Sequence, residues 1–249
     1  PIESEKTKKR LRDQGYGEKV WDVCLMNFAN IGEIEKKAGK LDFVLADLGV
    51  SSMQIDDPKR GFSFREEGPL DLRLNQQAGV PASERLKEMD AEEIEGMLFE
   101  NSDEPLARAI MSAKRKKQPI ETTSELREIV EQVVLRTKPE NPKEAVKKTC
   151  QRVFQALRID VNSEFEVLDS FLEALPHILK PGGKAAILTF HSGEDRMVKK
   201  SFQYYAREGI YSDIAKDVIR PSAKECASNP RARSTKFRWA VRSDVQKYD

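Results

Sequence analysis

The sequence has few of the residues from which metal sites and disulfide frameworks are built. Its cysteines, Cys24, Cys150 and Cys226, lie far apart and form no Cys-x-x-Cys pair, and His177 and His191 are its only histidines. Structural zinc sites use closely spaced cysteines and histidines, and disulfide scaffolds use many cysteines. We therefore expect no metal site, no disulfide framework and a reducing compartment.

Long apolar runs and a large net charge are also absent. No apolar stretch in the 249 residues approaches the ~18 residues that a membrane helix needs, so we expect no membrane span. The 43 basic and 42 acidic residues give a net charge of +1, which excludes a general polycation. Basic residues nevertheless cluster at 114–117 and 231–242. Such clusters are either phosphate-binding patches or solvated helix faces.

The first part of the chain alternates between helical and strand patterns. We predict helices over 1–14 and 31–38, and strands over 20–26 and 42–46, the second of which ends on Asp47. This alternation is typical of a parallel sheet with helices on its faces.

A helical segment then interrupts the sheet pattern. Residues 57–81 are rich in glycine and proline and predict an ordered loop, and 84–137 have helical periodicity. Helices at 151–160, 163–179 and 194–207 and strands at 184–190 and 236–242 follow. The sequence therefore predicts an α/β fold with a helical insertion, divided as 1–58, 59–150 and 151–249.

Polar or aromatic residues follow three of the predicted strands. They are Phe28, then Asp47 with Gln54, then His191. Ligands of open α/β sheets bind outside the carboxyl ends of the strands. Each residue alone has an ordinary interpretation, as a helix cap or a core aromatic. Their coincidence favours a binding site.

Longer motifs carry a resemblance to a known family. They are DLGVSSMQ from Asp47, DPKRGFSF from Asp57, GPLDLR from Gly68, FQALRI from Phe154, FHSGEDR from Phe190 and NPRARS from Asn229. In order and spacing, over essentially the whole chain, the sequence resembles the ribosomal RNA small-subunit methyltransferase H family, also called MraW.

The resemblance implies a Rossmann-like methyltransferase sheet, S-adenosylmethionine as cofactor, and an inserted helical domain that recognises RNA. The implied reaction is methylation of the N4 of a cytosine in the decoding centre of small-subunit ribosomal RNA. The implied partner is this RNA, or the assembled small subunit, in the cytoplasm of a bacterium or in an organelle of a eukaryote. A homodimer is compatible with the sequence. By matched position, Phe28, Asp47 and Gln54 resemble the family's cofactor contacts, with Phe28 against the adenine.

The sequence departs from the family's pattern in three places. Gly193 stands where leucine is usual, and Lys148 to Arg152 replace His-Pro-Ala-Thr-Arg. The glycine-rich first motif and the acidic residue for the cofactor ribose do not occur within the 249 residues. We therefore expect an N-terminally incomplete sheet, in which the strand ending at Asp47 has an exposed apolar edge.

Two residues are candidates for the chemistry. The cytosine amine needs a proton acceptor, for which Asp47 is the first candidate and His191 the second. Asp47 could instead serve the cofactor, and His191 could be structural. A flipped or single-stranded base needs aromatic and basic contacts, and the candidates for these are Arg60, Phe62, Phe64, Arg231, Arg233 and Lys236. Phe62 and Phe64 could instead pack the loop against its domain.

Two other functions remain open at this stage. One is a non-catalytic RNA-binding or ribosome-assembly module derived from the same fold. The other is a different nucleotide-dependent α/β enzyme, which the absence of a P-loop and of a Gly-x-Gly-x-x-Gly motif disfavours.

Overall fold

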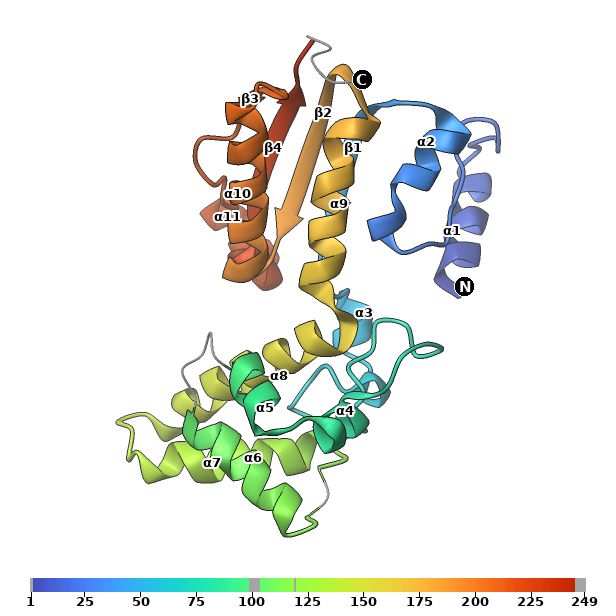
Figure 1. The fold of residues 1–249 in the computed structure, drawn as a ribbon. Coiled ribbons are helices and arrows are strands. Elements are labelled where there is room, and N and C mark those ends of the chain that lie inside the picture. Colours follow the sequence, from blue (N-terminus) through green and yellow to red (C-terminus); the bar gives the residue numbers. More distant parts are fainter. Residues whose placement is uncertain (1, 99–103, 119, 245–249) are drawn as a thin grey trace. The chain divides into compact units, whose positions relative to one another are not determined.

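The computed structural model describes residues 2–98, 104–118 and 120–244 (Figure 1). The chain divides into two compact units. We call Pro1–Asp47 with Val167–Asp249 the α/β unit, and Leu48–Glu166 the helical unit. No helix in the described part of the chain is long and apolar enough to cross a membrane.

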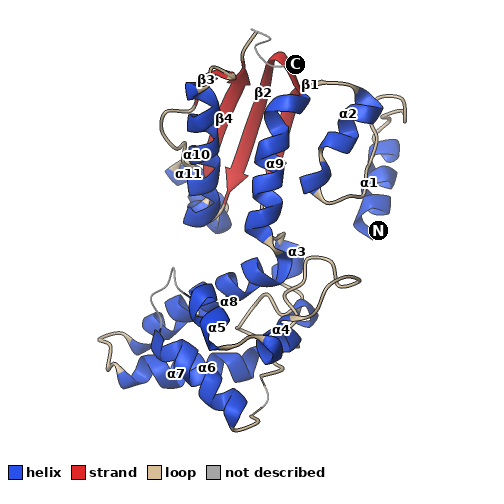
Figure 2. Cartoon of the chain, in the orientation of Figure 1, coloured by secondary structure: helices blue, strands red, loops and turns tan. Residues whose placement is uncertain are grey.

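A four-stranded sheet forms the centre of the α/β unit (Figure 2). Its order is β1-β2-β4-β3, where β1 is Leu41–Asp47, β2 is Leu179–Thr189, β4 is Lys236–Arg242 and β3 is Tyr211–Ile214. β1 pairs with β2 in parallel, whereas β4 pairs with both β2 and β3 in antiparallel fashion. With its flanking helices, the sheet gives the mixed α/β architecture that the sequence predicted.

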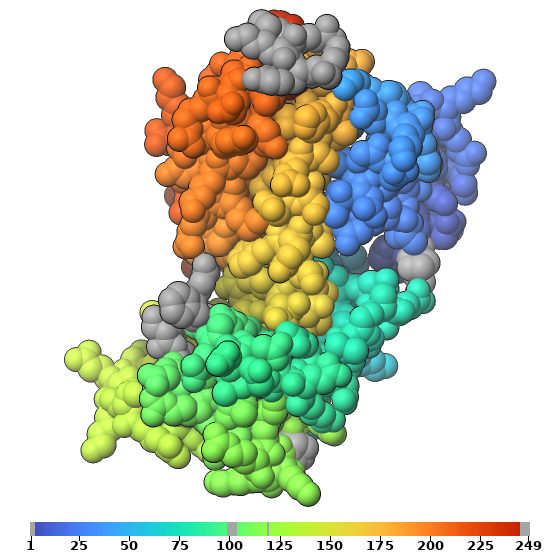
Figure 3. All heavy atoms as spheres, in the orientation of Figure 1, coloured from blue at the N-terminus to red at the C-terminus, as the bar shows by residue number. Residues whose placement is uncertain are grey.

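Two long helices cover one face of this sheet. They are α9 (Glu164–Ile178) and α10 (Ser192–Arg207), and they hide the strands in the view of Figure 3. Val44, Ala185, Ile187 and Ala240 are buried beneath them. The alternation of these positions follows from the two-residue period of a strand, which places every second side chain on the same face.

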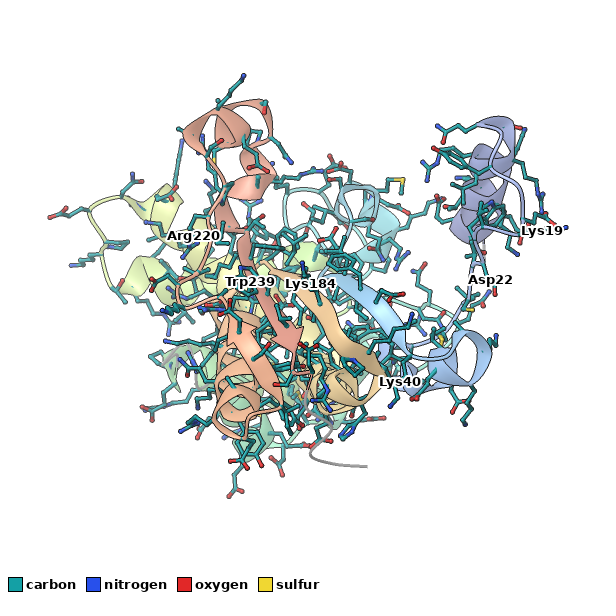
Figure 4. The ribbon with its side chains drawn as sticks, turned by 90° about the horizontal axis from the view of Figure 1, so that it is seen from above. Lys19, Asp22, Lys40, Lys184, Arg220 and Trp239 are labelled. Atoms are coloured by element: carbon teal, nitrogen blue, oxygen red, sulfur yellow. The ribbon has the colours of Figure 1, made fainter. Side chains whose placement is uncertain are left out.

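The opposite face has more exposed apolar side chains. Leu45, Ala186 and Trp239 are register partners across three strands, and Figure 4 labels Trp239 together with Lys184 of the neighbouring strand. Leu45 is 59% exposed and Phe43, also on β1, is 55% exposed. Among the described residues β1 is thus an edge strand of the sheet, and its exposed apolar side chains were expected from the sequence.

The remaining elements of the α/β unit are short. The N-terminal ones are α1 (Ile2–Asp13), η1 (Phe28–Asn30) and α2 (Gly32–Ala38). Near the other end are α11 (Ala223–Ser228) and η4 (Pro230–Ser234). The predicted helices over 1–14 and 31–38 are confirmed, whereas β3 and α11 were not predicted.

The predicted strand at 20–26 is wrong. This segment has no regular structure, and Val20 and Leu25 are 74% and 70% exposed. A strand forms only when a neighbour accepts and donates its backbone hydrogen bonds. Among the described residues no strand pairs with this segment, so its apolar pattern is not sufficient to make it a strand.

Helices make up most of the helical unit. Their bounds are α3 (Ser52–Ile55), η2 (Pro58–Arg60), α4 (Ala82–Glu88), α5 (Ala91–Leu98), α6 (Glu104–Arg115), α7 (Thr123–Arg136) and α8 (Pro142–Asn162). Their inward faces share one apolar core, in which Leu86, Ile94, Leu106, Leu126 and Leu157 are almost fully buried.

The helical unit has other bounds than the predicted insertion of 59–150. α8 continues without a break through residue 150 and ends only at Ser163, whose φ of 47° is left-handed. The predicted boundary at 150–151 came from the return of the sheet pattern and not from a helix-stopping residue. Because the core residues Cys150, Val153 and Leu157 lie on one helix, the compact unit includes the whole of α8.

Candidate functional site

Asp47 is the last residue of β1, and its side chain is exposed. It has no hydrogen-bond or ion-pair partner among the described residues. A carboxylate in this state offers all its lone pairs to a ligand. The position at the carboxyl end of a parallel strand is where ligands of such sheets bind.

Phe28 opens the short helix η1 and is 40% exposed. Its ring packs edge to face against Phe171 of α9, with a centroid distance of 5.4 Å. Asn27 caps the helix by accepting a hydrogen bond from the backbone N–H of Ala29 at 3.0 Å. The buried Phe171 therefore supports one side of an aromatic ring whose remaining surface can stack on a planar ligand.

His191 is the N-cap of α10 and is oriented by that helix. Its Nδ1 accepts a hydrogen bond from the backbone N–H of Glu194 at 3.4 Å, and its Nε2 lies 3.3 Å from a carboxylate oxygen of Glu194. Glu194 also accepts a hydrogen bond from the backbone N–H of Phe190 at 3.0 Å. The His191 side chain is 11% exposed. Both ring nitrogens therefore face the helix terminus.

A buried ion pair holds the same helix on the sheet. Arg238 of β4 donates two hydrogen bonds to Asp195 of α10, at 2.7 and 3.2 Å. The side chains are 7% and 16% exposed. Glu194 and Asp195 thus have structural roles within the FHSGEDR motif, of which the sequence analysis named only His191 as a site candidate.

Gln54 takes part in a capping box at the start of α3. Its side-chain oxygen accepts a hydrogen bond from the backbone N–H of Ser51 at 2.8 Å, and the Ser51 hydroxyl accepts one from the backbone N–H of Gln54 at 3.3 Å. This reciprocal arrangement stabilises the turn that follows β1. The side-chain amide N–H groups of Gln54 remain for a ligand.

The predicted RNA-binding residues of the loop after η2 are largely packed into the helical unit. Arg60 donates hydrogen bonds to the carbonyls of Arg73 and Leu74 at 2.9 and 2.8 Å, and its guanidinium lies 5.5 Å from the centroid of Phe62. Phe62 and Phe64 both pack against the apolar core. Both rings thus pack the loop onto its unit while staying partly exposed, and Arg60 holds the loop.

The GPLDLR motif and Asn162 fix the other end of this loop. Asp71 binds the Arg73 guanidinium at 2.7 and 3.0 Å. Asn162, in the last turn of α8, donates to the carbonyl of Leu72 and accepts from the backbone N–H of Leu74, both at 2.8 Å. Sequence reasoning did not identify Asn162 as a structural residue. The left-handed φ of 60° at Leu72, which these bonds hold, cannot be read from a leucine.

The remaining predicted RNA-binding residues lie on η4 and β4 of the α/β unit. Arg231 and Arg233 are exposed on η4, and Lys236 begins β4. Burial and the nearby Arg220 guanidinium, labelled in Figure 4, lower the pKa of Lys236.

Comparison with known proteins gives one consistent result. The model of the MraW methylase family matches residues 3–243. Ribosomal RNA small subunit methyltransferase H 1 of Agathobacter rectalis is 62% identical over 248 residues, which are 98% of this chain and 71% of that protein. The protein of the same name from Lachnoclostridium phytofermentans is 59% identical over 98% of this chain and 68% of its own length. Ribosomal RNA small subunit methyltransferase H of a Cyanothece species is 40% identical over 93% and 74%.

Proposed function

The chain belongs to the MraW methylase family, and from this premise we propose that it methylates the N4 of a cytosine in the decoding centre of small-subunit ribosomal RNA, with S-adenosylmethionine as the methyl donor. The family membership and the relatives support a small-subunit ribosomal RNA methyltransferase. The choice of an amine as the methyl acceptor rests on Asp47 at the end of β1. Its carboxylate is exposed and has no partner among the described residues.

Asp47 accepts the hydrogen bond, and then the proton, of the cytosine amine. The lone pair of this amine is delocalised into the ring, so the nitrogen attacks only as its proton is drawn away. A carboxylate is an acceptor-only group and suits this role. S-adenosylmethionine, when bound, supplies a methyl group that its sulfonium charge has already activated. What remains for the protein is to position the base and remove one proton.

Phe28, Asp47 and Gln54 are the residues that we propose for the cofactor. Phe28 offers a supported aromatic ring to an adenine, and Gln54 offers amide N–H groups. An aromatic face combined with polar acceptors and donors is the usual lining of a nucleoside site. The residues present therefore fit the cofactor that the family implies.

His191 is better explained as a positioning residue than as the base. Its Nδ1 accepts a hydrogen bond from the backbone of α10, and its buried Nε2 lies 3.3 Å from a carboxylate oxygen of Glu194, so the ring is held at the start of the helix. By capping α10 it fixes the point at which β2 turns into this helix. The structural alternative in the sequence analysis is thus the one that we favour.

Replacement of Asp47 by asparagine tests the proposal. Asp47→Asn keeps the shape but removes the proton acceptor, so we expect kcat for methyl transfer to fall by about 10² or more. Asp42→Asn is the matched control, because Asp42 lies on the same strand but is 82% exposed and pairs with Lys180 at 2.8 Å. The readout is N4-methylcytidine in small-subunit RNA, measured by nucleoside mass spectrometry.

Calorimetric titration with S-adenosylmethionine separates the two roles of Asp47. Loss of kcat with unchanged cofactor affinity supports the base. Loss of cofactor affinity with a normal kcat at saturation assigns Asp47 to the cofactor only. Unchanged kcat and affinity in Asp47→Asn would refute both roles.

A further inference from the structure

A pocket of about 290 Å³ lies within the helical unit. Three segments line it: the loop after η2, the first half of α7 and the first half of α8. Its lining residues are Phe64, Arg65, Arg127, Lys143, Val146, Lys147 and Cys150. The volume lies just below the usual range of ligand sites, about 300–1,000 Å³, and suits a small ligand group.

The floor of this pocket is apolar. Val146 and Cys150 are buried and lie four residues apart on α8, so they share one face of the helix. Phe64 is half-buried, and behind it lies Phe154, which is 4% exposed, at a centroid distance of 5.5 Å. Burial raises the pKa of Cys150 to about 11, so its thiol is neutral near pH 7. The floor is therefore uncharged and includes an aromatic ring backed by a second ring.

The rim of the pocket is cationic. Arg65, Arg127, Lys143 and Lys147 are all exposed, and none of the lining residues is acidic. Lys147 lies 3.6 Å from Glu144 in a solvent-exposed ion pair. For the other three cations, no carboxylate partner occurs among the residues that the structure describes.

The start of α8 adds to this positive potential. Lys143 directly follows Pro142, the first residue of the helix, so the positive end of the helix dipole lies beside the rim. The negative charge of Glu131 on α7 helps to raise the pKa of the Cys150 thiol, but Glu131 does not line the pocket. The charge at the opening is thus predominantly positive.

We propose that this pocket binds one nucleotide of single-stranded RNA, with the base on the apolar floor and its phosphates at the cationic rim. The inference rests on the proposed function, because the substrate is then a ribosomal RNA. Proteins that hold single-stranded RNA combine aromatic surfaces for bases with cations for the backbone. An acidic peptide would match the rim but leave the exposed part of the Phe64 ring uncovered.

Fluorescence anisotropy with a short, fluorescein-labelled single-stranded RNA tests this proposal at several salt concentrations. Removal of one phosphate contact lowers the magnitude of the slope of log K against log salt by about 0.7. We expect this change, with binding weakened several-fold, in both Arg127→Ala and Lys143→Ala. Arg136→Ala is the matched control, because Arg136 is an exposed arginine of α7 outside the pocket, and it leaves the slope unchanged.

A second variant tests the floor. Phe64→Leu keeps an apolar side chain against Phe154 but loses the ring, so we expect binding to weaken about fivefold or more with an unchanged salt slope. Circular dichroism checks that each variant is folded. This result separates base recognition from general attraction of a polyanion.

The possible outcomes separate a failure of the pocket proposal from a failure of the proposed function. If the unaltered protein does not bind the short RNA but methylates small ribosomal subunits, the pocket proposal fails and the proposed function stands. If it binds but the pocket variants behave like Arg136→Ala, the pocket proposal is wrong and the function stands. Equal competition by polyglutamate at the same salt concentration would also overturn the proposal, since the pocket would then select charge alone.

Discussion

At the scale of single residues, the motifs that look catalytic in the sequence divide into exposed and structural groups. Asp47 is exposed and unpaired among the described residues, whereas Glu194 and Asp195 are committed to the start of α10 and to Arg238. The sequence shows residue types at strand ends but not which carboxylates already have partners. Only the contacts in the structure show that Asp47 has no partner among the described residues, whereas Glu194 and Asp195 have partners.

The Asp195–Arg238 pair provides a stability prediction for the α/β unit. Asp195→Ala leaves a guanidinium that is 7% exposed without its carboxylate, so we expect a loss of about 3 kcal/mol. Asp42→Ala, which breaks the exposed pair with Lys180, should cost less than about 1 kcal/mol. Urea denaturation measures both. Equal costs would show that the burial of the Asp195 pair has no energetic consequence.

Gly68 provides a second prediction, in the helical unit. A methyl group added there would lie 2.0 Å from the carbonyl oxygen of Pro58, so the two backbone segments must separate. We expect Gly68→Ala to destabilise the unit by about 2 kcal/mol. Gly96→Ala is the control with the opposite sign, because Gly96 lies in α5 with open space around it and should gain about 0.5–1 kcal/mol. A neutral Gly68→Ala in thermal unfolding would contradict the close approach.

At the scale of elements, a helix or strand whose own residues carry its cap or its alternation can be predicted from the sequence. A strand that depends on a distant neighbouring strand cannot. β4 spans the predicted 236–242, because its alternation and its paired position agree. The start of α8 was missed, since the predicted helix began at 151, although Asn141 as N-cap and Pro142 as the first residue define that start. The segment 20–26 has the apolar pattern of a strand but no neighbouring strand in the described chain. Strand formation there depends on a partner that the local sequence does not contain.

The burial of one face of α8 predicts the order in which the cysteines react. Burial raises the pKa of Cys150 to about 11, so at pH 8 its thiolate is scarce and inaccessible, whereas Cys24 and Cys226 are partly exposed. We expect an aromatic disulfide reagent to modify these two first and Cys150 only on unfolding. The pKa of Cys150 is higher in the folded than in the unfolded protein, so raising the pH toward 11 favours unfolding. The Cys150 reaction should therefore become faster.

Cys150→Ser identifies the slow thiol. The variant should lose the phase that appears only on unfolding and retain the two native phases. If Cys150 reacts as fast as Cys24 in the folded protein at pH 8, α8 does not pack against α7 as described.

At the scale of the whole molecule, the family resemblance predicted more than the local patterns did. The mixed α/β sheet, the helical segment between its strands and the membership of the MraW methylase family all follow from motifs spread over the chain. The predicted site residues remain predictions, because their function depends on ligands. The pocket around Arg127 was not predicted, because its residues come from three segments that carry no motif together.

The central claim is the identity of the atom that is methylated, and one measurement tests it most directly. The protein at its natural length is incubated with S-adenosylmethionine and unmodified small ribosomal subunits or their naked RNA. The nucleosides are then resolved by mass spectrometry. We predict one new N4-methylcytidine, mapped to the decoding centre. Methylation of another base or atom, or RNA binding without methyl transfer, would contradict the account, and the second result would favour a non-catalytic assembly module.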